Sequence, residues 1–185
     1  MPKKVLLVST SCGSMGGGPT GLWLSELAEP YYLFKEAGLE VQIASTAGGA
    51  VPIDANSMGG DFFTAEAKKF MHDQEAFGLL CHSSKVGDLN AESFDCVYLT
   101  GGHGCCMDFV GVQAAGLINI VQGACARPDP AEPSPTAASR RGDMLGFFVC
   151  AECALRARSL ARTLAPRVQM PSASCLRQIA TALWA

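Results

Sequence analysis

Asp95-Cys-Val-Tyr-Leu-Thr-Gly-Gly-His-Gly104 joins a short apolar run to a turn of three glycines and a histidine. Such a run, bounded by turn residues, is typical of a strand buried on both faces of a parallel sheet. Glycines at the end of the strand let backbone amides approach a ligand closely and bind an anion. The same glycines would also suit a tight strand-to-helix turn that binds nothing.

Segments on either side of this turn extend the pattern. Two more apolar runs predict strands, and two stretches with helical periodicity predict helices, the first of them interrupted by Pro30, which removes one internal hydrogen bond. The predicted strands cover residues 4–9 and 40–45, and the predicted helices cover residues 21–38 and 65–72. Alternation of this kind predicts an α/β fold with a doubly wound parallel sheet, whose ligands bind where the strands end.

Composition limits the class of protein. The chain has 185 residues, of which 49% are hydrophobic, and a formal net charge of -3, as expected for one compact domain. No apolar run approaches the roughly 18 residues of a membrane span, so we expect a soluble, cytoplasmic protein that binds no membrane. Nine cysteines without a secretory signal predict free thiols. The arginines are scattered rather than clustered, so we expect no nucleic-acid-binding surface. Only 17% of the residues are charged, and a surface with so few charges is compatible with a homodimer interface.

The cationic residues divide the chain. All six lysines lie before residue 86, and all eight arginines lie after residue 126. Residues 1–126 therefore carry 13 acidic side chains against six lysines, and the remainder carries four against eight arginines. We predict an α/β domain over 1–126, a Pro-rich linker over 127–144 and an atypical Arg- and Ala-rich tail over 145–185.

Few residues suggest chemistry by themselves. Glu26 and Glu29 lie on one face of the first predicted helix, where either one would serve as an acid or base or simply as part of a solvated face. Cys150 begins a C-x-x-C motif at a predicted strand-to-helix junction, which suits a reactive thiol but is only half of a zinc site. The glycines between 13 and 18 do not form G-x-G-x-x-G. We therefore expect neither a metal nor another cofactor.

Several motifs in a fixed order suggest a family. They are Gly21-Leu-Trp-Leu-Ser-Glu26-Leu-Ala-Glu-Pro30, Val51-Pro-Ile-Asp54, and the 95–104 stretch followed by Asp108-Phe109. From residue 4 to about residue 111 the chain resembles the ThiJ/PfpI superfamily of class I glutamine-amidotransferase-like proteins, and within it the glyoxalase III and protein deglycase branch. The resemblance implies a flavodoxin-like sandwich.

The resemblance also implies a reaction and its residues. Family members use a cysteine nucleophile, a glutamate on the first helix that corresponds to Glu26, and a backbone amide that corresponds to Gly102. The implied activity is conversion of methylglyoxal to D-lactate without glutathione, or related detoxification of dicarbonyls, with a small dicarbonyl as the partner and no cofactor.

The nucleophile is where the sequence departs from the family. The family's Ala-x-Cys-His-Gly-Pro elbow does not occur, and Cys150 fits its context better than Cys125 does. The missing elbow supports an alternative function, in which the protein is an inactive relative that acts as a stress chaperone or thiol sensor. We hypothesise that the residues from about Val112 onward derive from a different reading frame or splice choice, because a stretch rich in Arg, Ala, Pro and Ser is what GC-rich sequence yields when it is read out of frame.

Overall fold

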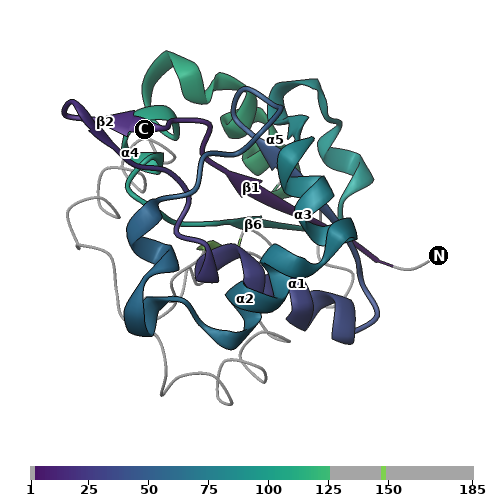
Figure 1. Ribbon diagram of the computed structural model, residues 1–185. Helices are drawn as coiled ribbons and strands as arrows, with labels where there is room; N and C mark the ends of the chain where they lie inside the picture. Colours follow the sequence, from purple (N-terminus) through teal and green to yellow (C-terminus); the bar gives the residue numbers. More distant parts are fainter. Residues whose placement is uncertain (1–2, 126–146, 149–185) are drawn as a thin grey trace, which may run out of the picture.

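The computed structural model describes residues 3–125 and 147–148, which form a sheet covered by helices on both faces (Figure 1). Four strands pair in parallel in the order β5-β4-β1-β6, and β7 pairs antiparallel with β6. The strands of this sheet are β1 (Lys4–Ser9), β4 (Glu40–Ser45), β5 (Ser84–Lys85), β6 (Cys96–Leu99) and β7 (Phe147–Phe148). The predicted α/β fold with a doubly wound parallel sheet is thus confirmed.

Helices and short elements complete the described part of the chain. A hairpin of β2 (Ser14–Met15) and β3 (Gly18–Pro19) turns through Gly16 and Gly17, whose φ angles of 60° and 83° suit glycine. The α-helices are α1 (Ser25–Glu36), α2 (Ala65–His72), α3 (Gln74–Cys81), α4 (Cys105–Asp108) and α5 (Ala115–Cys125). The 3-10 helices are η1 (Ala55–Met58), η2 (Gly60–Phe62), η3 (Val86–Asp88), η4 (Ala91–Ser93) and η5 (Gly111–Ala114).

The apolar run of β1 is continuous because both faces of the strand are buried. Val5 and Leu7 belong to a core beneath α1, α2 and α3, whereas Leu6 and Val8 belong to a second core beneath α5. Figure 1 shows α1 and α2 on one side of β1 and β6 and α5 on the other. All four side chains are fully buried, and each of them stabilises the fold by roughly 1.5–3 kcal/mol.

The first helix begins later than its sequence pattern predicts. Residues 21–24 were expected to be helical, yet Leu22 donates its amide to the Pro52 carbonyl (2.8 Å) and accepts from the Asp54 amide (2.9 Å). These bonds hold the segment extended, so α1 starts only at Ser25 and then continues through Pro30. Tertiary pairing here overrides helical periodicity.

The sheet's second face is covered by α5, which follows Val112. Leu117, Ile120 and Val121 of this helix are buried against the second core. Within the described residues, no helix is both long enough and apolar enough to cross a membrane.

Candidate active site

The carboxyl ends of β1, β4 and β6 meet at one edge of the sheet, as the pairing of parallel strands requires. The turn from Gly101 to Gly104 continues from β6 at this edge, and Thr100 anchors it by donating its amide to the Val8 carbonyl (2.9 Å). Ligands of doubly wound sheets bind at such edges. The turn is therefore the natural centre of a site.

Glu26 lies against this turn from the first turn of α1. Its side chain is buried, with 8% of the residue exposed, and its carboxylate packs so closely on Gly101 that a Cβ there would overlap Oε2. Among the described residues, Oε2 accepts no hydrogen bond of good geometry, although the backbone of Gly101 lies close enough to lower the pKa of the carboxyl. An acidic oxygen that is buried without a partner is rare and costly. We interpret it as an atom held ready for another group.

Burial changes the acidity of Glu26. Loss of solvent raises the pKa of the carboxyl from 4.5 to about 8, the backbone of Gly101 lowers it in part, and the negative charge of Glu29 raises it further. At neutral pH the side chain is therefore mostly a protonated acid, only about a unit from the pH at which it would be a base.

Glu29 is in a different environment although it is only three residues away. It is half-buried, and burial raises its pKa, while a hydrogen bond with the Thr64 side chain lowers it. Glu29 thus lies beside the residue that caps α2 rather than beside the turn. Only Glu26 combines burial, contact with the turn and a free oxygen.

Gly102 fits the turn because no other residue would. Its φ of 117° disfavours side chains, and a Cβ would overlap the carbonyl oxygen of Gly21 and approach the Trp23 amide. Trp23 in turn donates its amide to the Gly101 carbonyl (3.4 Å). The turn and the start of α1 therefore pack as one unit, which brings Glu26 and Gly102 together. The role of the Gly102 amide as an oxyanion donor stays a prediction.

Asp108 is a residue of this edge whose role the sequence did not suggest. It ends α4, and its carboxylate is buried, with 7% of the residue exposed. It accepts hydrogen bonds from the hydroxyls of Thr10 (2.8 Å) and Thr46 (2.5 Å) and from the Ser11 amide (2.7 Å). The donors come from the ends of β1 and β4, so one carboxylate joins both strand ends to the helix after β6.

Two cysteines near the turn, Cys105 and Cys12, donate hydrogen bonds to backbone carbonyls, and the Cys105 thiol lies near enough to Glu26 for the Glu26 charge to raise the thiol pKa. The Cys105 thiol is buried and donates to the Thr100 carbonyl, and burial raises its pKa well above the usual range, so it remains protonated. The half-buried Cys12 thiol donates to the Ser14 carbonyl. Cys125 is the last residue of α5, so it does not lie at a strand-to-helix elbow. Cys150, the preferred nucleophile, lies outside the described residues.

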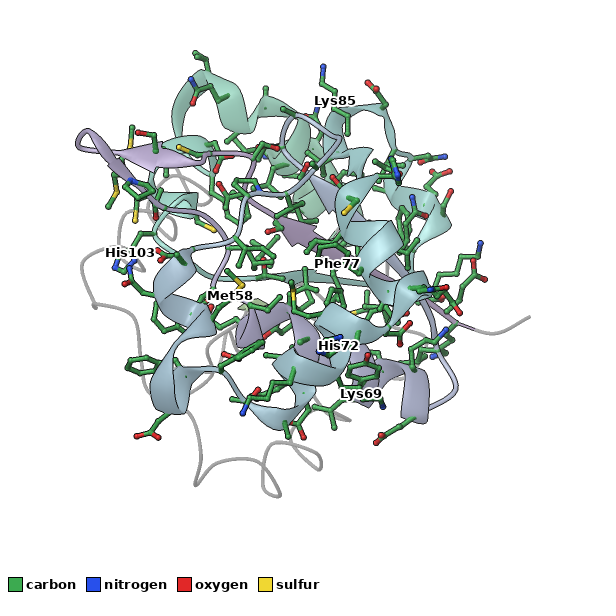
Figure 2. The ribbon with its side chains drawn as sticks, viewed as in Figure 1. Met58, Lys69, His72, Phe77, Lys85 and His103 are labelled. Carbon is green, nitrogen blue, oxygen red and sulfur yellow. The ribbon has the colours of Figure 1, made fainter. Side chains whose placement is uncertain are left out.

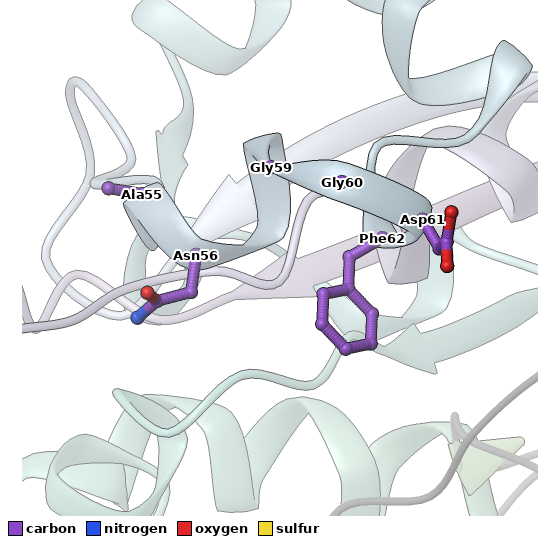
Figure 3. Close-up of a pocket in the computed structure, with 6 residues that line it drawn as sticks. All are labelled: Ala55, Asn56, Gly59, Gly60, Asp61 and Phe62. Carbon is purple, nitrogen blue, oxygen red and sulfur yellow. The ribbon is translucent and has the colours of Figure 1, made fainter.

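An open pocket adjoins the segment that leads into α1. It is lined by Ala55, Asn56, Gly59, Gly60, Asp61 and Phe62 (Figure 3). The Phe62 ring meets the Trp23 ring edge to face, with centroids 5.2 Å apart. His103, by contrast, is exposed and points away from the molecule (Figure 2). The described residues contain no cluster of three or more metal-ligating side chains.

Curated relatives match the chain over a little more than half its length. It is 32% identical over 111 residues to glyoxalase 3 of Candida albicans, which is 57% of this chain and 47% of that protein. It is 28% identical over 113 residues to the glutathione-independent glyoxalase HSP31 of Saccharomyces cerevisiae, which is 58% and 47% of the two chains. The chain thus spans about half the length of these relatives, and no family model matches it.

Solved structures agree with the sequence matches. The Rapid Encystment Protein of 24 kDa from Francisella tularensis superposes with a TM-score of 0.62 at 35% identity, over 67% of this chain and 54% of that one. Glyoxalase III from Candida albicans superposes with a TM-score of 0.58 at 29% identity, over 66% and 52% of the two chains. Over about 57% of its length, this chain is homologous to proteins named glyoxalase 3 or glutathione-independent glyoxalase.

Proposed function

We propose that the protein is a glyoxalase III-type enzyme that converts small 2-oxoaldehydes, methylglyoxal first among them, to 2-hydroxy acids without glutathione. The observation that carries the proposal is the buried Glu26 carboxyl, which packs on the glycine turn with a free Oε2 and a pKa of about 8. The matched relatives named glutathione-independent glyoxalases support the same reaction class.

The reaction needs a thiolate and a proton carrier. A thiolate adds to the aldehyde carbon of methylglyoxal and forms a hemithioacetal. The Glu26 carboxylate removes the hydrogen of that carbon as a proton and returns it to the neighbouring carbon, while the hydroxyl proton of the first carbon passes to the second oxygen. The resulting thioester of lactate is hydrolysed by water and releases the thiol, so the net reaction is methylglyoxal plus water to lactate.

Glu26 is suited to the proton transfer by its environment. A carboxyl with a pKa near the working pH both accepts and returns a proton, and such groups typically accelerate reactions by about 10²–10⁴-fold. In this proposal the Gly102 amide stabilises the oxyanion that develops on the substrate. Cys150 is the proposed source of the thiolate.

The test uses the full chain, methylglyoxal without glutathione, and D-lactate as the measured product. We expect turnover by the unmodified protein and a loss of about 10²–10⁴-fold in Glu26→Gln. Glu29→Gln is the matched control, because it makes the same change of a carboxyl to an amide on the same helix, beside Thr64, and we expect it to stay close to the unmodified rate. Cys150→Ser should abolish turnover.

Two results would contradict the proposal. The first is an absence of D-lactate at high protein concentration, which would favour the inactive relative that acts as a chaperone or thiol sensor. The second is a Glu26→Gln variant as active as Glu29→Gln, which would remove Glu26 from the reaction.

A further inference from the structure

The two ends of the Gly101–Gly104 turn pack against different groups: the Glu26 carboxylate at one end, and at the other Thr10, which bonds the carboxylate of Asp108. Glu26 packs on Gly101 at the first end. At the second end, a Cβ on Gly104 would lie 2.6 Å from the Cys12 carbonyl oxygen and 2.7 Å from the Thr10 methyl carbon. The proposed reaction uses the Glu26 carboxylate only, so the role of the Asp108 carboxylate requires its own explanation.

Thr10 connects Gly104 to the second carboxylate. Its hydroxyl donates to Asp108 Oδ1 (2.8 Å) and accepts from the Cys12 amide (2.9 Å). A hydroxyl fixed by one donor and one acceptor has a single orientation, and Thr10 is fully buried. Asp108 thus fixes the orientation of the Thr10 side chain, against which Gly104 packs.

Asp108 also forms hydrogen bonds with the residues that follow β1 and β4. Its second oxygen, Oδ2, accepts from the Ser11 amide and from the Thr46 hydroxyl. The Ser11 hydroxyl then accepts from the Ala47 amide (2.9 Å). Hydrogen bonds to a carboxylate are roughly twice as strong as neutral ones, so Asp108 fastens the ends of β1 and β4 to α4.

We propose that Asp108 is a positioning residue, which acts through Thr10 to hold the Gly101–Gly104 turn where its amides meet the reacting oxygen. This inference rests on the proposed function. An amide that meets charge only in the transition state affects kcat more than KM. A displacement of about 1 Å can cost 10²-fold in rate.

The test compares Asp108→Asn with Asp54→Asn. Asp54 is equally buried, at 4% exposed, but it caps η1 and bonds Asn56 and Thr20, so it reports the general cost of losing a buried carboxylate. We expect Asp108→Asn to lower kcat by about 10–100-fold with KM within about threefold of the unmodified value. Asp54→Asn should leave kcat close to normal.

Thr10 provides a conservative pair for the same test. Thr10→Val keeps the shape and loses the hydroxyl, whereas Thr10→Ser keeps the hydroxyl. We expect Thr10→Val to lower kcat as Asp108→Asn does, and Thr10→Ser to retain most of it. A similar loss in both Thr10 variants would show that packing, and not the hydrogen bond to Asp108, holds the turn.

A second measurement, by NMR, does not depend on enzymatic activity. Amide ¹H–¹⁵N shifts and hydrogen exchange of residues 101–104 should change in Asp108→Asn and Thr10→Val and stay constant in Asp54→Asn. Unchanged turn amides in Asp108→Asn overturn the inference, even if the protein loses stability. If the unmodified protein makes no D-lactate, the proposed function fails and these amides alone decide whether Asp108 holds the turn.

Discussion

Gly101→Ala is expected to lower methylglyoxal turnover by about 10²-fold or more, because the new methyl group would occupy the place of Glu26 Oε2. The Glu26 carboxyl must then leave the turn, because its atoms are the three nearest to the new methyl group. We expect a cost of about 1–3 kcal/mol in the free energy of unfolding, as for other overpacked sites. Steady-state kinetics and urea denaturation measure the two effects.

Two further variants show whether the carboxyl is the cause. In Gly101→Ala combined with Glu26→Ala, the methyl group has room, so the stability cost of the pair should be smaller than the sum of the single costs. Gly78→Ala in α3 is the matched control, because a Cβ at Gly78 meets no atom within 4 Å. It should leave turnover unchanged. A fully active Gly101→Ala would mean that Glu26 does not act from this position.

Glu26→Gln is expected to stabilise the protein, and more so at pH 9 than at pH 5. Between pH 4.5 and about 8 the folded protein holds a proton on Glu26 that the unfolded chain has released. Stability therefore falls as pH rises through this window, and the loss is complete above about pH 8. The shift corresponds to roughly 4–5 kcal/mol at most. Glutamine is neutral throughout and avoids this loss.

Urea denaturation at the two pH values, with Glu29→Gln beside Glu26→Gln, measures the effect. The difference between Glu26→Gln and the unmodified protein should grow with pH, and the Glu29 variant should show a smaller change because Glu29 is only half-buried. An equal difference at pH 5 and pH 9 would mean that Glu26 titrates near its ordinary pKa.

Three strands of the sheet and one helix were predictable from local sequence alone, whereas the short β2, β3 and β5 were not predicted. Residues 4–9 and 40–45 coincide with β1 and β4, and residues 65–72 coincide with α2, because a doubly buried strand and a capped amphipathic helix each have a clear local pattern. The helix α3 was missed, although Asp73 marks it by accepting from the amides of Glu75 and Ala76 (3.1 Å each). An N-cap signal would have found it.

The site was less predictable because its contacts join distant residues. Sequence periodicity placed Glu26 and Glu29 on the same face, and only their tertiary neighbours separate them: Gly101 for the first and Thr64 for the second. The hydrogen-bond partners of Asp108 are separated from it by 62 to 98 residues in the sequence, so no local sequence pattern predicts these bonds. The choice of Cys150 as the nucleophile stays a prediction, since it lies outside the described residues.

The most direct test of the central claim, that Glu26 holds a proton at neutral pH, is a titration of its side-chain carboxyl carbon by ¹³C NMR between pH 4 and pH 10. Comparison with Glu26→Gln assigns the resonance. A midpoint near 8 is the predicted result. A midpoint near 4.5 would contradict it, because a carboxylate that is already ionised at neutral pH is neither desolvated nor held ready to carry a proton as proposed.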